Sequence, residues 1–321
     1  MSEITAKIVA DSITRRGNCR VTTFIIKAPR FLLAELNTHR MLSRNSASNR
    51  ARPLSVTTKD VTNDPFAFPL GLMAAHKGMQ GSDFLDDATL EQAKKVWLKM
   101  RDDVIAGVLE LDRLGVTKQI TNRPLEPFSW HEAIVSGTDW ENFFALRAHP
   151  DTEIHLARLA TLMLEAYNAS MPKLLKEGEW HVPFGDCMDM DKIRAIAQNE
   201  AEIEKIKLQI AAARCARISY KPFGDEAKYD YAADLRLFKT LVDGNHVSPL
   251  EHGARAMTED EWDKYVSTRG EEVEKGWCGN FRGFIQLRKL YPSENRKDPR
   301  VLPKLVNEQG IVYTPINTSS Q

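Results

Sequence analysis

The sequence is poor in cysteine, and the cysteines that it has are widely spaced. No two of the four form a CxxC pair: Cys19, Cys187, Cys215 and Cys278. Cysteines paired at such short spacing are common ligands of structural zinc, so the sequence argues against a zinc site. Free thiols are typical of the reducing cytosol, although four cysteines could also pair as disulfides.

Long hydrophobic runs and an excess of one charge are also lacking. No apolar stretch approaches the roughly 20 residues of a membrane-spanning helix, and the N-terminal MSEITAKIVADS has no apolar signal-peptide centre. The 44 basic and 44 acidic side chains cancel, which argues against a general nucleic-acid-binding protein. We therefore expect a cytoplasmic protein with neither a membrane nor a nucleic acid as its partner.

Common nucleotide-binding motifs are absent from the sequence as well. It contains no GxGxxG and no GxxxxGK[ST], so neither a Rossmann dinucleotide site nor a P-loop is supported. What it does contain is 321 residues, of which 42% are hydrophobic. That is enough for one large domain or two small ones with a buried core.

Hydrophobic patterns predict one strand and several helices. Residues 21–29 are rich in β-branched side chains and end at Pro29, which favours a strand. The polar stretch 43–65 predicts a structured loop. Alternating strand and helix signals allow either an α+β or an α/β fold. Helices are predicted at 30–42, 140–147, 152–168, 189–213 and 230–243, with a connector at 171–187.

The longest predicted helix runs from Ala88 to Leu114. Apolar residues recur there at helical spacing. Thr89 and Gln92 could form a capping box, and Gly115 lies where a helix would end.

The most informative segment is THRMLSRNSASNR at residues 38–50. Its polar side chains supply cations, amides and hydroxyls that suit phosphate oxygens and the edges of heterocycles. A solvated loop with helix caps is the alternative interpretation. The candidate ligand-binding residues are His39, Arg40, Ser43, Asn45, Ser48 and Arg50.

A second segment, residues 139–158, contains Asn142 and Arg147. Five residues correspond to about 500° around a helix, so the two side chains lie on nearly opposite faces. They therefore serve different ligands, unless the helix ends between them. Arg147 could instead form a surface ion pair with Asp151 or Glu153, and such pairs contribute little.

Two more segments carry candidate side chains. ARCARISY at 213–220 is followed by LVDGNHVSPLEH, which contains His246, Glu251 and His252. Glu251 and His252 could equally make only a local hydrogen bond. By contrast, residues 276–289 mix Gly, Trp, Phe and Arg, and we favour a core strand with arginines that reach solvent.

These segments together resemble the flavin-dependent thymidylate synthases. Residues 38–50 are similar to the family signature R-H-R-x-x-S-x-N-E-x-S-x-R, and residues 139–158 resemble S-L-x-N-F-L-x-L-R followed by A-Q-x-E-I. Residues 213–252 resemble A-A-R-V-S-[FY] … G-H-x-[ST]-P-x-E-H. That block precedes the His-Arg motif in the family and follows it here, so the chain resembles a divergent, circularly permuted member. Permutation requires termini that lie close together.

The resemblance implies a role for each matched residue. Arg147 would polarise the pyrimidine and Ser48 would orient it, while Ser48 and Arg50 would hold the uracil nucleotide. A family arginine that grips phosphate matches either Asn122 or Arg123, and we favour Arg123 because a guanidinium binds phosphate bidentately. The residues implied in binding FAD are His39, Arg40, Asn45, Asn142 and His246, and Glu251 and His252 would shape the wall beside His246.

The resemblance also implies a reaction, a fold and an assembly. The reaction is reductive methylation of dUMP to dTMP with methylenetetrahydrofolate and NADPH. The fold is α+β, a twisted, largely antiparallel sheet with long helices, assembled as a homotetramer with shared active sites. The expected divisions are a core part at 1–170, a connector with a charged helix at 171–205, a second core part at 206–300 and a tail at 301–321.

Several positions depart from the family pattern, including Thr152 and Glu153 in place of Ala-Gln. Thr38 replaces the first Arg of the signature, Ser46 replaces its Glu, and Glu35 lies where a Gln is usual. These changes motivate two alternatives: an enzyme that makes another 5-substituted pyrimidine nucleotide, such as 5-hydroxymethyl-dUMP, or a non-catalytic nucleotide-binding protein of the same fold.

Overall fold

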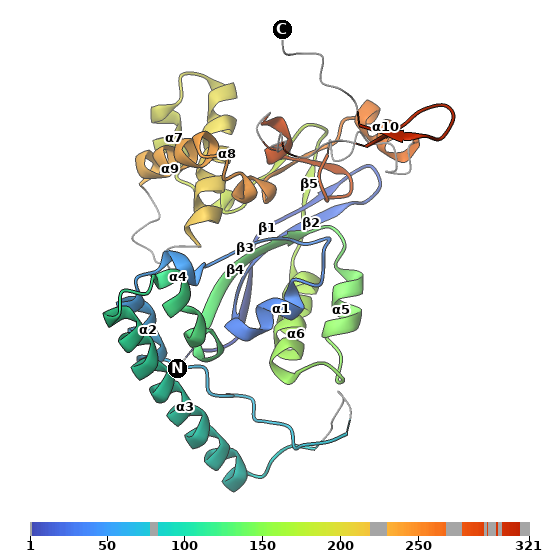
Figure 1. Cartoon of the computed structure of the whole chain (residues 1–321). Coiled ribbons are helices and arrows are strands. Elements are labelled where there is room, and N and C mark those ends of the chain that lie inside the picture. The colour runs from blue at the N-terminus through green and yellow to red at the C-terminus, as the bar shows by residue number, and fades with distance from the viewer. Residues whose placement is uncertain are drawn as a thin grey trace.

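A five-stranded, mixed sheet forms the centre of the protein (Figure 1). The computed structural model describes residues 2–77, 83–218, 230–267, 278–291, 294, 300 and 304–314. Strand order is β3-β4-β2-β1-β5, and only β5 runs parallel to its neighbour. The predicted α+β fold with a largely antiparallel sheet is therefore confirmed. The strands are β1 (Thr5–Thr14), β2 (Arg20–Pro29), β3 (Ser43–Ser46), β4 (Trp130–Gly137) and β5 (Lys173–Leu175).

Two helices cover one face of this sheet. They are α5 (Glu141–Arg147) and α6 (Ile154–Ala169), and both were predicted. Alternation along β2 points Phe24 and Ile26 toward them, and both side chains are fully buried. The Phe24 ring meets Trp140 edge to face at 5.0 Å.

The opposite face packs against the C-terminal half of the chain. Ile25 and Ile134 of the sheet contact Phe184, Cys215 and Ile218 there. This half contains α7 (Met190–Ile196), α8 (Glu200–Arg217), α9 (Tyr231–Asp243) and α10 (Glu259–Ser267), together with the small sheet β6 (Trp180–His181), β7 (Ala254–Ala256) and β8 (Phe284–Gln286). The segment 276–289 thus contributes a buried core strand, as favoured from its sequence; its residues 276 and 277 lie outside the described residues.

The long helix α3 (Asp87–Arg113) extends along one side of the molecule (Figure 1). Its Trp97 and Val108 pack against Leu125 and Phe128. Shorter elements complete the description: η1 (Arg30–Leu32), α1 (Leu33–Leu36), η2 (Asn49–Ala51), α2 (Leu54–Asn63), α4 (Lys118–Thr121), η3 (Arg123–Phe128), η4 (Gly185–Cys187), η6 (Ser248–Glu251), η7 (Leu287–Leu290), β9 (Leu305–Val306) and β10 (Val312–Tyr313).

The helix predicted at 30–42 is wrong, because α1 ends at Leu36. The Arg44 guanidinium donates to the carbonyls of Leu36 (3.0 Å) and His39 (2.6 Å), and the Thr38 hydroxyl donates to that of Glu35 (2.7 Å). These side chains donate to carbonyl oxygens that would accept from backbone N–H groups in a longer helix. The helix therefore ends here, and the chain turns back toward the sheet.

Three other local predictions need correction, and one strand was missed. The loop predicted at 43–65 contains β3, η2 and α2, since pairing with β4 makes a strand of a polar sequence. The helix at 189–213 is two helices, and the Asn199 side chain caps the second by accepting from the Glu202 amide. Asp86, not Thr89, caps α3. Strand β1 was not predicted at all.

The position of the chain ends bears on the proposed permutation. Ser2 bonds to Asp64 at the end of α2, whereas the red hairpin of β9 and β10 lies at the far upper right in Figure 1. The start of β1 and the hairpin of β9 and β10 therefore lie apart, so proximity of the ends does not explain the order of the motifs.

A buried charge cluster joins α8 to α9 and supplies a test of the fold. The Asp234 carboxylate, 1% exposed, meets Arg214 at 3.5 Å and Arg217 at 2.7 Å. Because Asp234→Asn leaves two cations facing a neutral amide, we expect a loss of about 3–5 kcal/mol in the free energy of unfolding, measured with denaturant. Asp191→Asn is the control, since Asp191 is 96% exposed in its pair with Arg194 and should change stability by less than about 0.5 kcal/mol. Equal effects of the two variants would contradict the prediction.

Candidate functional site

A hydrogen bond joins the first two predicted segments. At the end of α5, Arg147 donates from Nε to His39 Nε2 (2.9 Å) and from Nη2 to the Thr38 hydroxyl (3.2 Å). The two residues are 108 positions apart in the sequence. The alternative in which Arg147 pairs with Asp151 or Glu153 is wrong, because Asp151 faces His149 and Glu153 accepts from His155.

His39 is neutral in this arrangement. Its Nε2 accepts the Arg147 proton, so the ring proton lies on Nδ1. Burial lowers the pKa of His39, and the positive charges of Arg147 and Arg44 lower it further. The ring also packs edge to face against Phe143 at 4.9 Å, which holds its orientation.

The third predicted segment binds to β3 through Asn45. The Asn45 side chain donates to the Ser248 hydroxyl at 3.0 Å and accepts from His252 Nε2 at 3.0 Å. Glu251 instead pairs with Arg288 at 2.8 Å. The interpretation of Glu251 and His252 as a local hydrogen bond is therefore wrong, since each binds a distant segment.

Asn122 and Arg123 have different environments. Asn122 is fully buried, and its amide donates to the carbonyls of Asn49 (2.8 Å) and Arg52 (2.9 Å). Arg123 is exposed, as is Arg50, and neither makes an ion pair within the described residues. Asn122 thus braces the turn that carries Arg50 and leaves Arg123 as the available cation.

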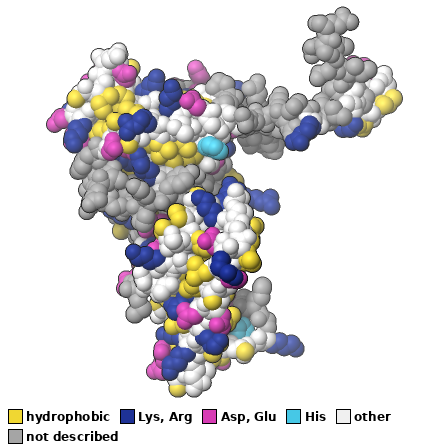
Figure 2. All heavy atoms as spheres, turned by 60° about the vertical axis from the view of Figure 1, so that its left-hand side comes forward, with side chains coloured by type: hydrophobic (Ala, Val, Ile, Leu, Met, Phe, Trp, Pro, Cys, Tyr) yellow, Lys and Arg dark blue, Asp and Glu magenta, His cyan; other side chains and the backbone are white. Residues whose placement is uncertain are grey.

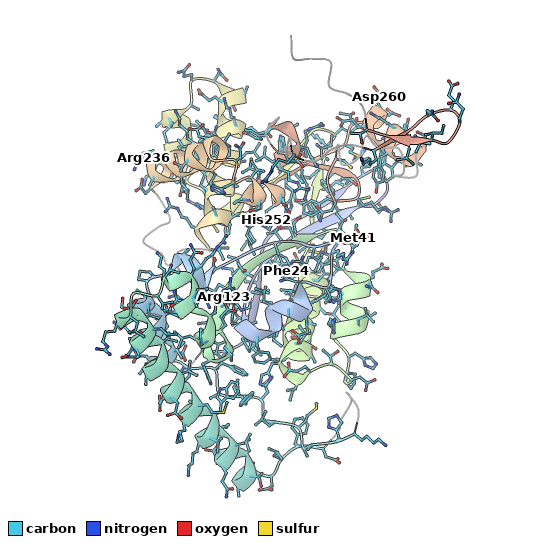
Figure 3. The ribbon with its side chains drawn as sticks, in the orientation of Figure 1. Phe24, Met41, Arg123, Arg236, His252 and Asp260 are labelled. Atoms are coloured by element: carbon cyan, nitrogen blue, oxygen red, sulfur yellow. The ribbon has the colours of Figure 1, made fainter. Side chains whose placement is uncertain are left out.

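The candidate residues lie in two groups along β3. His39 and Arg147 lie at its start, whereas Ser48 and Arg50 follow its end. Ser48 lies five positions after Ser43 along an extended chain, a distance of about 16 Å. Figure 3 shows Met41 and Arg123 on opposite sides of His252, consistent with this spacing.

The remaining candidates lie at the surface. Arg40, Asn142 and His246 are exposed. Asn142 and Arg147 both belong to α5, so the helix does not end between them, and their different exposure agrees with opposite faces. A single chain therefore gathers the candidates around β3 without enclosing them in one pocket.

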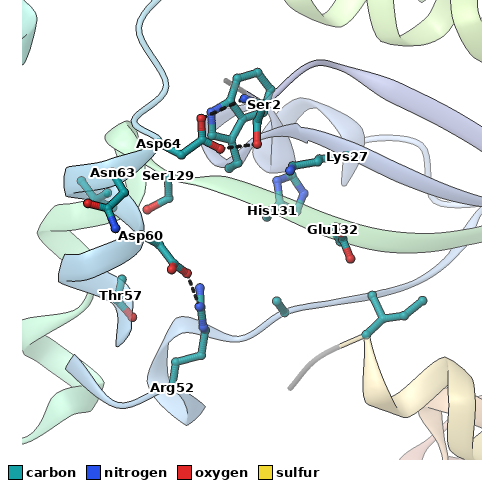
Figure 4. Close-up of a pocket in the computed structure, with 14 residues that line it drawn as sticks. Ser2, Lys27, Arg52, Thr57, Asp60, Asn63, Asp64, Ser129, His131 and Glu132 are labelled. Carbon is teal, nitrogen blue, oxygen red and sulfur yellow. Dashed lines mark hydrogen bonds and ion pairs between the residues drawn. The ribbon is translucent and has the colours of Figure 1, made fainter. Parts of the chain in front are cut away.

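A cavity of about 290 Å³ adjoins the end of β3 (Figure 4). Ala47 and Arg52, which flank the predicted nucleotide residues in sequence, form part of its wall. Lys27 and Glu132 also line it and are directly opposed on β2 and β4. Sequence reasoning missed these four residues, and only the sheet register brings Lys27 and Glu132 together.

A buried histidine of this cavity has an unused acceptor. The His131 Nδ1 donates to the Ala28 carbonyl at 3.0 Å, while its Nε2 has no partner within the described residues. Burial lowers the pKa of His131 to about 3, so the ring is neutral and Nε2 can accept a hydrogen bond.

The cysteines are all unpaired. Burial raises the pKa of Cys19, Cys215 and Cys278, which makes each a poor nucleophile. Within the described residues, no cluster of three or more His, Cys, Asp or Glu side chains is placed to bind a metal. No helix in the described part of the chain is long and apolar enough to span a membrane.

Comparisons with known proteins give similarity only at the level of structure. No protein-family profile and no curated protein matches the sequence. Two solved structures of a UMP/dUMP methylase, PolB from Streptomyces cacaoi, are similar to the chain at 16% identity. The match to the structure bound with 5-Br UMP has a TM-score of 0.43 and covers 52% of this chain and 89% of the PolB chain. The match to the structure bound with 5-Br dUMP has a TM-score of 0.42 and covers 52% of this chain and 90% of the PolB chain.

The contact between Arg147 and His39 predicts a change in a titration. Arg147→Gln removes a positive charge beside the imidazole, so the pKa of His39 should rise toward its ordinary value near 6.5. Burial and the positive charge of Arg44 still lower the pKa of His39 in this variant, so its pKa should rise only part of the way to that value. NMR titration of the histidine ring protons measures it, with the exposed Arg194→Gln in α7 as the control. A pKa of His39 that stays constant or falls in Arg147→Gln would show that the two side chains are not in contact.

Proposed function

We propose that this protein is a flavin-dependent thymidylate synthase, which reductively methylates dUMP to dTMP with FAD, NADPH and methylenetetrahydrofolate. The observation that carries the proposal is the Arg147–His39 hydrogen bond. It joins two of the segments whose sequences resemble family motifs. The third matching segment attaches to the same strand through Asn45.

Arg50 and Arg123 fit the role of phosphate ligands. Both are exposed, and the Asn122 brace brings the turns that carry them together. Their guanidinium groups can bind phosphate oxygens bidentately. The adjoining cavity offers Lys27 as a donor and Glu132 as an acceptor to the rest of a nucleotide.

The residues expected to bind FAD fit this group in part. Arg40 and Asn142 are exposed, and the neutral His39 ring keeps an Nδ1 proton to donate. Asn45 is different, because Ser248 and His252 already occupy its amide, so we assign it to holding the 246–252 loop. When bound, FAD would supply the reducing equivalents that the methylation requires.

In this proposal, Arg147 stabilises negative charge on a pyrimidine. Its hydrogen bonds use Nε and Nη2, and its Nη1 has no partner within the described residues. Because both partners are neutral, the cation keeps its full charge for a ligand. Charge stabilisation by a group already held in place is a large contribution to catalysis.

A second product is a real alternative because of Glu35. Its Oε2 is buried without a hydrogen-bond partner within the described residues, close to the turn that carries His39. Such an acceptor favours a ligand with an additional hydroxyl or N–H group. This supports the alternative of a 5-hydroxymethyl nucleotide, which mass spectrometry of the product distinguishes from dTMP.

The proposed reaction predicts a flavin absorbance spectrum and NADPH oxidation that depends on dUMP.

Arg123→Ala should raise the KM for dUMP about 10- to 100-fold, because a hydrogen bond to a charged group contributes about 1.5–3 kcal/mol. Arg236→Ala is the control, since this exposed residue lies on α9, far from Arg123 in Figure 3. A protein that binds neither FAD nor dUMP would refute the proposal, and an unchanged KM in an active Arg123→Ala enzyme would refute the phosphate assignment.

Assembly into a homotetramer belongs to the same proposal. One chain separates the Arg147 and Arg50 groups by the length of β3, so a second copy would be needed to bring them to one ligand. An exposed apolar stripe along α3 and its C-cap residue fits such a contact: Val96 (60%), Met100 (50%), Leu111 (36%) and the C-cap Leu114 (67%). Gly107 shares this face, and a Cβ there would meet open space, so another helix could approach closely. Figure 2, which brings this side forward, shows hydrophobic side chains among the charged ones.

A matched pair of substitutions on α3 tests this contact. Met100 and Leu109 are equally exposed, at 50% and 49%, but nine residues place them about 180° apart around the helix. Met100→Glu should reduce the molecular mass measured by light scattering, while Leu109→Glu should leave it unchanged. A monomeric wild-type protein, or equal effects of the two variants, would contradict the assignment.

A further inference from the structure

A continuous row of hydrogen bonds crosses the sheet beneath the candidate site. It starts with the Ser12 hydroxyl on His181 Nδ1 (2.9 Å) and continues from His181 Nε2 to Thr23 (2.8 Å). Thr23 meets Ser136 at 2.6 Å, and Ser136 meets His252 Nδ1 at 2.8 Å. His252 Nε2 then reaches Asn45, which donates to Ser248. Strands β1, β2, β4 and β3 contribute one residue each.

The direction of every proton in this row follows from Asn45. Its amide nitrogen donates to Ser248, so its oxygen accepts and His252 carries its proton on Nε2. His252 Nδ1 must then accept from Ser136, whose oxygen accepts from Thr23. Thr23 in turn accepts from His181 Nε2. The hydroxyls of Thr23 and Ser136 therefore each donate once and accept once, and both histidines have the same tautomer.

Burial makes this order strict. Thr23, Ser136, His181 and His252 are all 0% exposed, so solvent cannot replace a missing partner. Burial also lowers the pKa of His181 to about 4 and that of His252 to about 3, which keeps both rings neutral. A buried polar group without its partner is costly, so a break at one position disturbs its neighbours.

We infer that this row is a positioning device for the candidate site: it fixes the tautomers of His181 and His252 and thereby the orientation of the Asn45 amide. Asn45 in turn holds Ser248, and with it the loop that carries His246, against β3. The functional consequence rests on the proposed function, since the resemblance assigns His246 to the flavin site. Thr23, Ser136, His181 and His252 are positioning residues, and the proposal gives none of them a contact with a ligand.

Thr23 and its neighbour Thr22 provide a matched test. Both are threonines of β2 with 0% exposure, and each hydroxyl is hydrogen-bonded. The Thr22 hydroxyl donates to Asp11 at 2.9 Å and lies outside the row. Thr23→Val removes the link between the two histidines at nearly constant shape, Thr22→Val removes a hydrogen bond elsewhere, and Thr23→Ser restores the hydroxyl.

The first measurement is the tautomeric state of the eight histidines, obtained from ring nitrogen shifts in histidine-labelled protein at pH 7. Wild type, Thr22→Val and Thr23→Ser should show two rings with the proton on Nε2, assigned by His181→Gln and His252→Gln. Thr23→Val should shift at least one of them toward a mixture of tautomers and move the Asn45 side-chain amide signals. Ser136→Ala should do the same if Thr23→Val does not fold. A wild-type His252 with its proton on Nδ1, or a Thr23→Val spectrum equal to that of Thr22→Val, would overturn the inference.

The second measurement is FAD affinity of the same variants. Thr23→Val should weaken FAD binding at least threefold relative to Thr22→Val, and Thr23→Ser should restore it. If the wild type binds no FAD, the proposed function fails while the tautomer measurement still decides the positioning role. If Thr23→Val changes the tautomers but binds FAD as the wild type does, the row does not position the site and that part of the inference is wrong.

Discussion

The pairing of β3 with β4 is the interaction on which the candidate site depends. Its ladder places a four-residue polar strand at the edge of the sheet, where side chains alternate between faces. Arg44 points to one side and fixes the turn that presents His39. Ser43 and Asn45 point to the other side and bind the C-terminal half through Gln286, Ser248 and His252. A slip of one residue in this register would move Arg44 to the opposite face of the sheet and would move Ser43 and Asn45 to the face that Arg44 now occupies. The hydrogen bonds that hold the three predicted segments together would then be lost.

The contact between the sheet and the C-terminal half is unusual in being partly polar. Burying serines, threonines and histidines is unfavourable unless each group finds a partner, so a row of them contributes less to stability than an apolar layer would. What such a row provides is specificity, because only one arrangement satisfies every donor and acceptor. The apolar contacts of Ile25 and Ile134 with Phe184 and Cys215 hold the two layers together beside it.

How far the sequence predicted this structure depended on whether the information was local. Strand β2 and helices α3, α6 and α9 follow from periodicity within one segment. Strand β3 does not, because Ser, Arg and Asn have little tendency to form strands and only pairing with β4 makes them one. Asn122 and Arg123 are adjacent in sequence, and the sequence alone does not say which of the two is buried. His181 is an isolated histidine in the sequence, and its hydrogen-bond partners lie on distant strands.

The arginines of the candidate site differ from several other arginines of the protein. Arg20, Arg217 and Arg255 meet carboxylates at 2.6–2.8 Å. Arg40, Arg50, Arg123 and Arg147 make no ion pair within the described residues, although the chain has as many acidic as basic side chains. Arg147 in particular is held by a neutral imidazole and a hydroxyl, which fix its geometry without cancelling its charge. Like charges gathered without counterions destabilise a folded chain slightly, and a bound anion would relieve that repulsion. Under the proposed function, a nucleotide phosphate and a charge-bearing pyrimidine would supply that anion.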